Sequence, residues 1–297
     1  MNPDGGARSR PRTLTVPAPA KLNLFLHVTG RRADGYHLIE TLFVALDFGD
    51  TLSLTHRSDG AIRRTTDLPG VPVERDLAIR AATSLQQETH CPQGVDISIV
   101  KRIPAGGGLG GGSSDAATVL LALNRLWGLD LPRAQLMQIG LSLGADVPFF
   151  LHGEPALARG IGDRLTSVSI PPLWIAVVAP RVIVSTAEIF AAAELTRDSP
   201  ATKMDVFSEG YGRNDLQPAA VARFPDIAAA LTMLSARSRG ARMSGSGGCV
   251  FAPFASEAEA QAALEVLPPA LQGFVARTLS QHPLAAFARC SERVPRG

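Results

Sequence analysis

The chain has 297 residues, 45% of them hydrophobic and 19% charged, with a formal net charge of +2. This length and composition allow one large domain or two ordinary domains with a well-buried core. Lys and Arg are spread along the chain, which argues against a nucleic-acid partner, and no apolar run has membrane-spanning length. Cys91, Cys249 and Cys290 form no C-x-x-C pair and the histidines lack zinc-ligand spacing, so we expect a reduced, cytoplasmic protein.

The first 12 residues are polar and rich in Arg, Gly and Pro. They contain no apolar h-region, so we interpret residues 1–12 as a disordered extension and not as a signal peptide.

In the stretch Leu14–Val28 the residue character alternates from one position to the next, which predicts a strand. One face would carry Leu22, Leu24, Leu26 and Val28, and the other Lys21, Asn23, Phe25 and His27. Lys21 and Asn23 are then neighbours on one side of the strand. A lysine at a strand start is usually a solvated edge charge, but here its apolar surroundings imply burial with a partner.

A turn at Asp34-Gly35 precedes Tyr36 and His37, and two further strands are predicted at Leu38–Leu46 and Asp50–Thr55. The pair Tyr36 and His37 is suited to stacking on a base or a sugar. Packing of the same two side chains along a hairpin explains the pattern equally well. Residues Asp76–Glu88 have helical spacing.

Residues Val95–Ile99 alternate as a half-buried strand that we expect Pro104 to end. Six glycines follow between Gly106 and Gly112, and a helix is predicted from near Ser114 to Trp127, with Gly128 as its stop. Backbone N–H groups without Cβ atoms can approach a ligand closely, and a helix N-terminus favours an anion. This strand, loop and helix therefore predict a phosphate-binding loop.

The loop is not a Walker A motif, because no Lys precedes Ser113. Gly106, Gly108 and Gly111 do match G-x-G-x-x-G, and Asp130 lies near the spacing of a ribose-binding acid. In a dinucleotide-binding fold that acid ends a second strand. Asp130 instead lies in a short connector, where we expect it to cap the next helix, Pro132–Leu143, so a dehydrogenase is disfavoured.

Asp146 stands in the connector between this helix, which Gly144 ends, and the apolar residues Val147–Phe150. It is either an Asx-turn residue before x-Pro or a carboxylate held on rigid supports, as a general base should be. The residues leave both interpretations open.

A second module begins near Ser167 and alternates strands with helices. Strands are predicted at Trp174–Ala179, Cys249–Ala252 and Phe274–Leu279. Capping signatures at Ser185–Glu188 and Ser256–Glu259 begin two helices, and another helix spans Pro225–Leu234. Residues 196–218 are loose and polar, and Met243–Gly248 form a second glycine-rich turn.

Five segments together resemble the GHMP small-molecule kinases, in order and over nearly the whole chain: Pro19-Ala-Lys-Leu-Asn-Leu24, Arg32-Ala-Asp-Gly-Tyr-His37, Pro104–Ser114, Leu143-Gly-Ala-Asp-Val-Pro148 and Met243-Ser-Gly-Ser-Gly247. The resemblance implies an α+β, two-domain fold. Residues 13–165 would form a ribosomal-protein-S5-like ATP-binding domain and residues 166–297 a ferredoxin-like C-terminal domain, with the active site in the cleft between them.

The first two segments imply a member that phosphorylates the 2-hydroxyl of a cytidine-diphosphate-linked methylerythritol, using ATP and Mg²⁺. Asp146 matches the catalytic acid and Lys21 its partner. The implied ATP loop comprises Pro104, Ala105, Gly106, Gly107, Gly108, Leu109, Gly110, Gly111, Gly112, Ser113 and Ser114. The implied substrate contacts are Asn23, Tyr36, His37, Thr186, Phe190, Ser244, Gly245, Ser246 and Gly247.

The chain departs from the family pattern at Gly248, where alanine is expected. Mg²⁺ ligands are not assigned, and Ser113 and Ser114 are only candidates. The alternatives are a GHMP kinase acting on homoserine or mevalonate, which lack a base for Tyr36 and His37, and a nucleotide-binding regulatory module without catalysis. We expect a monomer or a weak homodimer.

Overall fold

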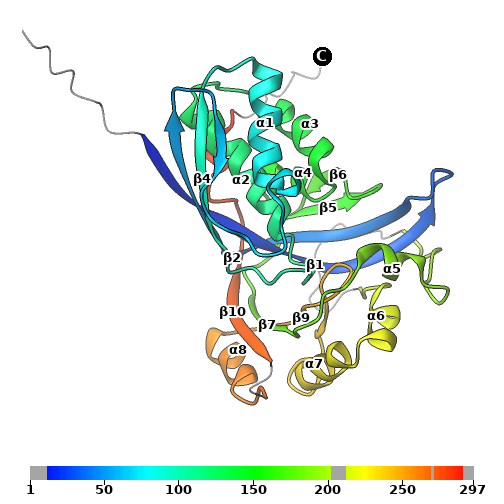
Figure 1. Ribbon diagram of the computed structural model, residues 1–297. Coiled ribbons are helices and arrows are strands. Elements are labelled where there is room, and N and C mark those ends of the chain that lie inside the picture. Colours follow the sequence, from blue (N-terminus) through cyan, green and yellow to red (C-terminus); the bar gives the residue numbers. More distant parts are fainter. Residues whose placement is uncertain (1–11, 202–211, 269–270, 290–297) are drawn as a thin grey trace, which may run out of the picture.

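The computed structural model describes residues 12–201, 212–268 and 271–289 (Figure 1). The predicted N-terminal extension lies outside these residues except for Arg12, as does Cys290. The strands are β1 Thr13–Arg31, β2 His37–Arg57, β3 Ile62–Arg64, β4 Gly94–Val100, β5 Ala156–Arg159, β6 Arg164–Ser167, β7 Trp174–Ala179, β8 Arg242–Met243, β9 Val250–Phe254 and β10 Gln272–Leu279. The helices are α1 Leu77–Thr89, α2 Gly111–Leu126, α3 Arg133–Leu143, α4 Val147–His152, α5 Thr186–Ala191, α6 Gln217–Arg223, α7 Pro225–Ser235 and α8 Glu257–Leu264, with 3₁₀ turns at Val73–Arg75 and Ala285–Phe287.

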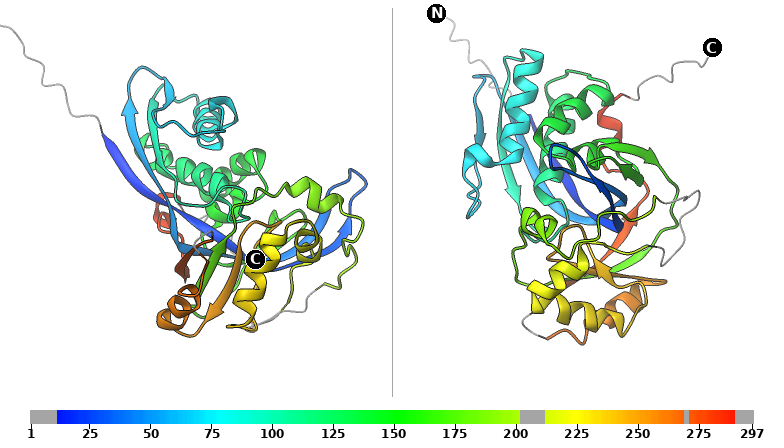
Figure 2. Two further views of the ribbon diagram at one scale, coloured as in Figure 1. Left: turned by 60° about the horizontal axis from the view of Figure 1, so that its bottom comes forward. Right: turned by 90° about the vertical axis from the view of Figure 1, so that its right-hand side faces the viewer.

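The long antiparallel pair β1 and β2 runs through the middle of the molecule (Figure 1). Helices α1–α4 lie on one side of this pair, and α5–α8 lie with β7, β9 and β10 on the other (Figures 1 and 2). Along the sheet the strand order is β3-β4-β2-β10-β7-β9-β8, and β1 and β5 also pair with β2. Strand β10 joins the two parts, because it pairs with β7 along most of its length and with β2 at its end.

Three hydrophobic clusters fill the interior of the described chain. One packs α1–α4 on β2 and β4, another packs α5–α8 on β7 and β9, and a third lies between β1, β2 and β7. The first also receives Leu284 and Ala288 from the C-terminal end, and the second receives Leu26 and Val28 from β1. The domain division at residues 165 and 166 stays a prediction. Over the described residues, every helix is too short or too polar to cross a bilayer.

Most predicted elements are confirmed to within a few residues, including α1, α7, β7 and both capping serines, Ser185 and Ser256. The prediction of two strands between residues 38 and 55 was wrong, because β2 is continuous. Gly49 does not turn the chain. It lets β1 approach instead, since a Cβ there would lie 2.1 Å from the carbonyl oxygen of Ala18.

The predicted faces of β1 are correct only in part. A register irregularity between Asn23 and Leu26 interrupts the alternation. Phe25 consequently packs in the same cluster as Leu22 and Leu24, whereas Leu26 joins a different one. The strand is buried on both faces here, so hydrophobicity alone could not reveal the bulge.

The prediction that Asp130 caps the following helix was wrong. Pro132 occupies the N-cap position of α3, and among the described residues no side-chain hydrogen bond caps the start of that helix. Asp130 has a left-handed backbone (φ 55°), and its carboxylate forms an ion pair with Arg289 near the C-terminal end. The left-handed conformation is tolerated by Asp more readily than by most residues.

Candidate active site

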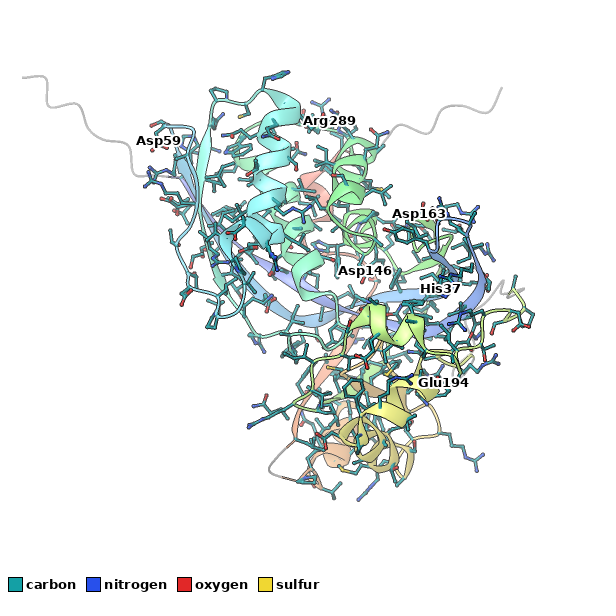
Figure 3. All side chains as sticks on the ribbon, turned by 45° about the vertical axis from the view of Figure 1, so that its right-hand side comes forward. His37, Asp59, Asp146, Asp163, Glu194 and Arg289 are labelled. Carbon is teal, nitrogen blue, oxygen red and sulfur yellow. The ribbon has the colours of Figure 1, made fainter. Side chains whose placement is uncertain are left out.

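A cleft of about 810 Å³ opens where the α1–α4 side of the molecule meets the α5–α8 side. Asp146 and His37 both lie along this junction (Figure 3). The volume lies within the range of small-molecule sites. The cleft is lined by Lys21, Asn23, Leu26, Arg31, Asp34, Gly35, Tyr36, His37, Ile39, Phe43, Gly106, Gly108, Gly110, Ala145, Asp146, Ile161, Val184, Thr186, Ala187, Phe190, Ala191, Arg197, Leu216, Gly245 and Ser246.

Lys21 and Asp146 form an ion pair in this cleft. The Nζ of Lys21 lies 3.3 Å from Oδ2 of Asp146 and donates a 2.6 Å hydrogen bond to Oδ1 of Asn23. Lys21 is 3% exposed, whereas the side chain of Asp146 is 34% exposed. Within the described chain the Asp146 carboxylate makes no capping bond to α4, which does not support its use as an Asx-turn residue. The cation is therefore fixed, and its carboxylate partner still faces the cleft.

Thr41 on β2 orients the polar side chains around Lys21. Its hydroxyl accepts a 2.8 Å hydrogen bond from Nδ2 of Asn23 and donates to the carbonyl of Phe25. The amide of Asn23 is thereby turned so that its oxygen faces Lys21. Lys21 also lies over the ring of Phe43, 5.0 Å from the centroid. These contacts leave the ammonium group little freedom.

The first glycine loop lies directly beside Lys21. Gly106, Gly108 and Gly110 line the cleft and have positive φ angles of 68°, 73° and 73°. A Cβ on Gly110 would lie 2.9 Å from Cγ of Lys21. Helix α2 begins at Gly111, three residues before the predicted start, because the glycines after Gly110 adopt helical geometry. Its first N–H groups can therefore bind an anion next to Lys21.

The second glycine loop packs against the first. A Cβ on Gly108 would lie 2.2 Å from the carbonyl oxygen of Ser244, and the hydroxyl of Ser244 donates to the carbonyl of Gly108. Gly248, where we expected alanine, has a φ of 93° and would place a Cβ 2.5 Å from the carbonyl oxygen of Gly106. Glycine at 248 thus permits a contact between the loops that alanine would displace.

The other end of the cleft carries the aromatic side chains. The rings of His37 and Phe190 lie 4.9 Å apart with an interplanar angle of 31°. Tyr36 is 64% exposed beside them. Burial, followed by the charges of Arg197 and Arg31, lowers the pKa of His37. Neutral His37 and Phe190 can therefore present π-surfaces to a planar ligand.

Further hydrogen bonds join α5 to the second glycine loop and hold that loop in place. The hydroxyl groups of Thr186 and Ser246 share a 2.7 Å hydrogen bond at the start of α5. Asn214 fixes the second glycine loop by donating to the carbonyls of Met243 and Gly245. The sequence placed Asn214 only in a loose polar stretch, so its role as a loop support was missed.

A second lysine cluster lies outside the cleft, beside the first turn of α2. Lys101 pairs with the buried carboxylates of Asp50 and Asp115. Asp50 also accepts from the backbone N–H groups of Arg102 and Ile103, which lead into the glycine loop. Burial raises the pKa of Asp115 to about 7, in spite of Lys101. This cluster anchors the loop and contributes no side chain to the cleft lining.

The two loop serines have different surroundings. Ser114 is fully buried, and its hydroxyl donates a 2.6 Å hydrogen bond to the carbonyl of Pro19. Its side chain is therefore not among those that line the cleft, and its place in the implied ATP loop stays a prediction. Ser113 is half-buried. Its hydroxyl lies close to Gly144 in the connector that carries Asp146, since a Cβ on Gly144 would lie 3.7 Å from it.

Of the predicted substrate residues, Ser244 is fully buried and ties the two loops together, so it contributes support and no direct cleft surface. Among the predicted loop residues, the following are also absent from the cleft lining: Pro104, Ala105, Gly107, Leu109, Gly111, Gly112, Ser113 and Gly247. The structure brings Lys21, Asn23 and Asp146 into one cleft with the rings of His37 and Phe190. It adds Arg31 and Arg197, which the sequence did not single out.

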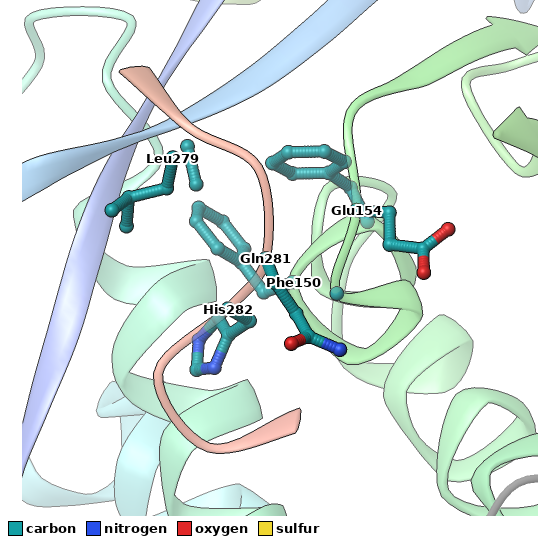
Figure 4. Close-up of a pocket in the computed structure, with 8 residues that line it drawn as sticks. Phe150, Glu154, Leu279, Gln281 and His282 are labelled. Atoms are coloured by element: carbon teal, nitrogen blue, oxygen red, sulfur yellow. The ribbon is translucent and has the colours of Figure 1, made fainter. Parts of the chain in front are cut away.

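A separate small cavity of about 10 Å³ lies beside the C-terminal segment and is lined by Phe150, Glu154, Leu279 and His282, among others (Figure 4). Nδ1 of His282 accepts from the backbone N–H of Leu284, and burial lowers the His282 pKa to about 4. The cavity has room for about one water molecule. It is too small for a substrate site.

Two family models match the chain, the GHMP kinases N terminal domain at residues 76–154 and the GHMP kinases C terminal at residues 191–271. The 4-diphosphocytidyl-2-C-methyl-D-erythritol kinase of Ralstonia nicotianae is 57% identical over 92% of this chain and 96% of that protein. That of Cupriavidus necator is 55% identical over 94% and 97%.

The solved structures give the same result for the fold. A crystal structure of 4-(cytidine 5'-diphospho)-2C-methyl-D-erythritol kinase superimposes with a TM-score of 0.79 at 34% identity, covering 89% of this chain and 99% of that one. Homoserine kinase from Cytophaga hutchinsonii shares the fold, with a TM-score of 0.68 at 19% identity over 93% and 97%. The two-domain α+β fold expected from the sequence is therefore confirmed. The chain belongs to the GHMP kinases and, within them, to the family of 4-diphosphocytidyl-2-C-methyl-D-erythritol kinases.

Proposed function

We propose that this enzyme transfers the γ-phosphoryl group of ATP to the 2-hydroxyl of 4-diphosphocytidyl-2-C-methyl-D-erythritol, a step of non-mevalonate isoprenoid biosynthesis. The observation that carries the proposal is one cleft with a Lys21–Asp146 pair and a glycine loop at one end and the His37–Phe190 pair at the other. Such a cleft suits a long substrate with a base at one end and a reactive alcohol at the other.

The reacting end supplies what phosphoryl transfer requires. Catalysis of this reaction depends mainly on positioning and on neutralising charge. Asp146 faces the cleft and would orient the acceptor hydroxyl and take up its proton late in the transfer. Lys21 would stabilise the charge that develops on the transferred group, since its ammonium is fixed by Asn23 and Asp146.

The N–H groups of the glycine loop and of the first turn of α2 would hold the ATP phosphates. Mg²⁺ is usually held by one or two protein oxygens together with substrate phosphates. Asp146 offers such an oxygen in the cleft, and the Ser113 hydroxyl lies beside the connector that carries Asp146, whereas the Ser114 hydroxyl donates to Pro19. Across the described residues, no group of three or more His, Cys, Asp or Glu side chains could hold a metal by itself, which fits an ion carried by the nucleotide. A bound Mg²⁺ would neutralise phosphate charge.

The base end distinguishes this proposal from homoserine or mevalonate phosphorylation. Those acceptors have no aromatic group to occupy the surface formed by His37 and Phe190. An enzyme for a small acceptor would have little use for a cleft of about 810 Å³ with aromatic side chains at the far end.

The test is ADP release in a coupled assay with the cytidine-diphosphate substrate. We expect Asp146→Asn and Lys21→Ala each to lower kcat by about 10²- to 10⁴-fold while ATP binding is retained. Asp226→Asn, an exposed substitution on α7, serves as the matched control. Full turnover in both variants would mean that the catalytic pair is misassigned. Turnover of a small alcohol but not of this substrate by the wild type would refute the substrate assignment.

A further inference from the structure

Arg197 follows α5 in a segment without regular structure and lines the cleft beside His37. Its side chain is half-buried and makes four hydrogen bonds. One of them joins two parts of the chain that are 160 residues apart: Nε of Arg197 donates to Nε2 of His37 over 3.2 Å. The remaining guanidinium nitrogens all point to backbone carbonyls.

Those carbonyls belong to the end of α5 and the residues after it. Nη2 of Arg197 donates to Ala192 at 2.7 Å and to Phe190 at 3.2 Å, and Nη1 donates to Leu195 at 3.0 Å. Carbonyls at a helix C-terminus have no partner within the helix. The planar guanidinium satisfies several of them at once, a geometry that a lysine cannot reproduce. Arg197 thereby fixes the backbone of Phe190.

The bond to His37 also determines which ring nitrogen carries the proton. A guanidinium has donors only, so Nε2 of His37 must be the acceptor and must be unprotonated. His37 is then neutral with its proton on Nδ1. A protonated imidazole would place a second cation against Arg197 and lose this bond. The lowered pKa of His37, caused by burial, Arg197 and Arg31, agrees with this arrangement.

Arg197 is itself held in place. Two residues further on, the N–H of Ser199 donates to the carbonyl of Val28 on β1, and its hydroxyl donates to Asp215 over 2.6 Å. Asp215 is buried and also accepts from the N–H of Val28 over 2.8 Å. The segment that carries Arg197 is therefore tied to the central strand. This connection allows Arg197 to hold α5 and β2 in a fixed relation.

We propose that Arg197 is a positioning residue for recognition of the base. It holds His37 of β2 against Phe190 of α5 and keeps His37 neutral with the proton on Nδ1, so that the aromatic surface is assembled before substrate binds. The role in substrate binding rests on the proposed function, whereas the tautomer of His37 does not. Loss of Arg197 should weaken binding of the cytidine-diphosphate substrate without affecting ATP.

The first test needs no substrate. ¹⁵N NMR of the imidazole groups distinguishes the two neutral tautomers, and a His37→Gln variant assigns the His37 signals. We expect the wild type to show a protonated Nδ1 and a bare Nε2 at pH 7.5. Arg197→Ala should shift His37 towards a mixture of tautomers, and Arg223→Ala should not. Arg223 is the matched control because it pairs with Glu194 near α5 and, in the described part of the chain, does not line the cleft. A wild-type His37 protonated at Nε2 would overturn the proposal.

The second test separates KM from kcat. One lost hydrogen bond of a charged group corresponds to about 10- to 100-fold in binding. We expect Arg197→Ala and Arg197→Lys to raise KM for the cytidine-diphosphate substrate by about that factor, with kcat and KM for ATP changed less than about threefold. In a double-mutant cycle, the Arg197→Lys effect should largely disappear in a His37→Gln background. Equal changes in both KM values, or full additivity with His37→Gln, would refute positioning through His37.

Because Arg197→Ala could also destabilise the end of α5, Arg197→Lys keeps the charge and most of the side chain. If the wild type does not phosphorylate the cytidine-diphosphate substrate, the proposed function fails, and the NMR result still decides whether Arg197 controls His37.

Discussion

Two lysines flank the same turn of the first glycine loop but are surrounded differently. A Cβ on Gly110 would contact the side chain of Lys21, and one on Gly111 would lie 3.4 Å from Nζ of Lys101. Lys21 is buried, and its carboxylate partner Asp146 is 34% exposed in the cleft. Lys101 is 32% exposed at its side chain, and its partners Asp50 and Asp115 are buried. The carboxylate of Asp146 is accessible to a ligand in the cleft, whereas those of Asp50 and Asp115 are enclosed.

The two lysine clusters thus differ in the accessibility of their carboxylates, and in the proposed function this difference separates the pair that serves phosphoryl transfer from the cluster that holds the loop. A buried acid must keep its counter-charge, because an unpaired buried charge is strongly unfavourable. The second oxygen of Asp50 accepts hydrogen bonds from the backbone N–H groups of Arg102 and Ile103 and so holds the residues that lead into the loop. In the described structure the Asp146 side chain makes no capping hydrogen bond to its own helix, α4. The loop is thus anchored on the Lys101 side, and on the other side Asp146 is left accessible in the cleft.

Replacing each lysine by an uncharged residue tests the difference between the two lysine clusters most directly. We expect Lys101→Met to lower the free energy of unfolding by on the order of 3 kcal/mol, because two buried carboxylates lose their cation. Lys21→Met should cost only about 1 kcal/mol, since water can solvate Asp146. It should lower kcat by about 10²- to 10⁴-fold, as expected for Lys21→Ala. Urea denaturation and ADP release measure the two effects. A larger loss of stability in Lys21→Met than in Lys101→Met would contradict this account.

His282 is a buried titratable group of a different kind (Figure 4). Among the described residues its ring accepts from the backbone of Leu284 and forms no ion pair. Its pKa is lowered to about 4 by burial and, to a smaller extent, by Arg133. Above pH 6.5 the imidazole is neutral in both the folded and the unfolded protein. As the pH falls from 6.5 to about 4, only the unfolded chain gains the proton, so stability declines by about 1.4 kcal/mol per pH unit.

Substitution of His282 by Asn isolates this effect, because the amide oxygen can still accept from the N–H of Leu284. Between pH 7.5 and pH 5 we expect the wild type to lose about 2 kcal/mol more stability than His282→Asn, measured by urea denaturation at each pH. Other titrating groups are common to both proteins and cancel. Parallel pH profiles would show that the pKa of His282 is the same in both states.

The smallest expected effects distinguish the adjacent serines at the start of α2. Ser114→Ala leaves the carbonyl of Pro19 without its donor, so we expect a loss of about 1–2 kcal/mol in stability and an unchanged KM for MgATP. Ser113→Ala should change stability by less than about 0.5 kcal/mol and raise KM for MgATP by about tenfold. Thermal denaturation and the ADP assay are sufficient. The reverse pattern would place Ser114, and not Ser113, at the nucleotide.

The sequence determined the local parts of this site. The alternation around Lys21 and Asn23 put both side chains on one side of β1, and their 2.6 Å hydrogen bond bears this out. The strand, glycines and amphipathic helix predicted the loop and α2, apart from three residues at the helix start. These features follow from periodicity and from the conformational freedom of glycine, which are properties of short segments.

The tertiary structure decided what depends on contacts between distant segments. It decided that β2 passes Gly49 without turning, because β1 approaches there, and that Asp130 meets Arg289 instead of capping α3. It placed Ser114 under Pro19 and Arg197 against His37, and neither pairing has a signal in sequence spacing. The sequence by itself thus specified the strands, helices and glycine turns. Packing selected which of their polar groups are enclosed and which remain available to a ligand, because burial depends on the segments that cover a residue and these lie far away in the chain.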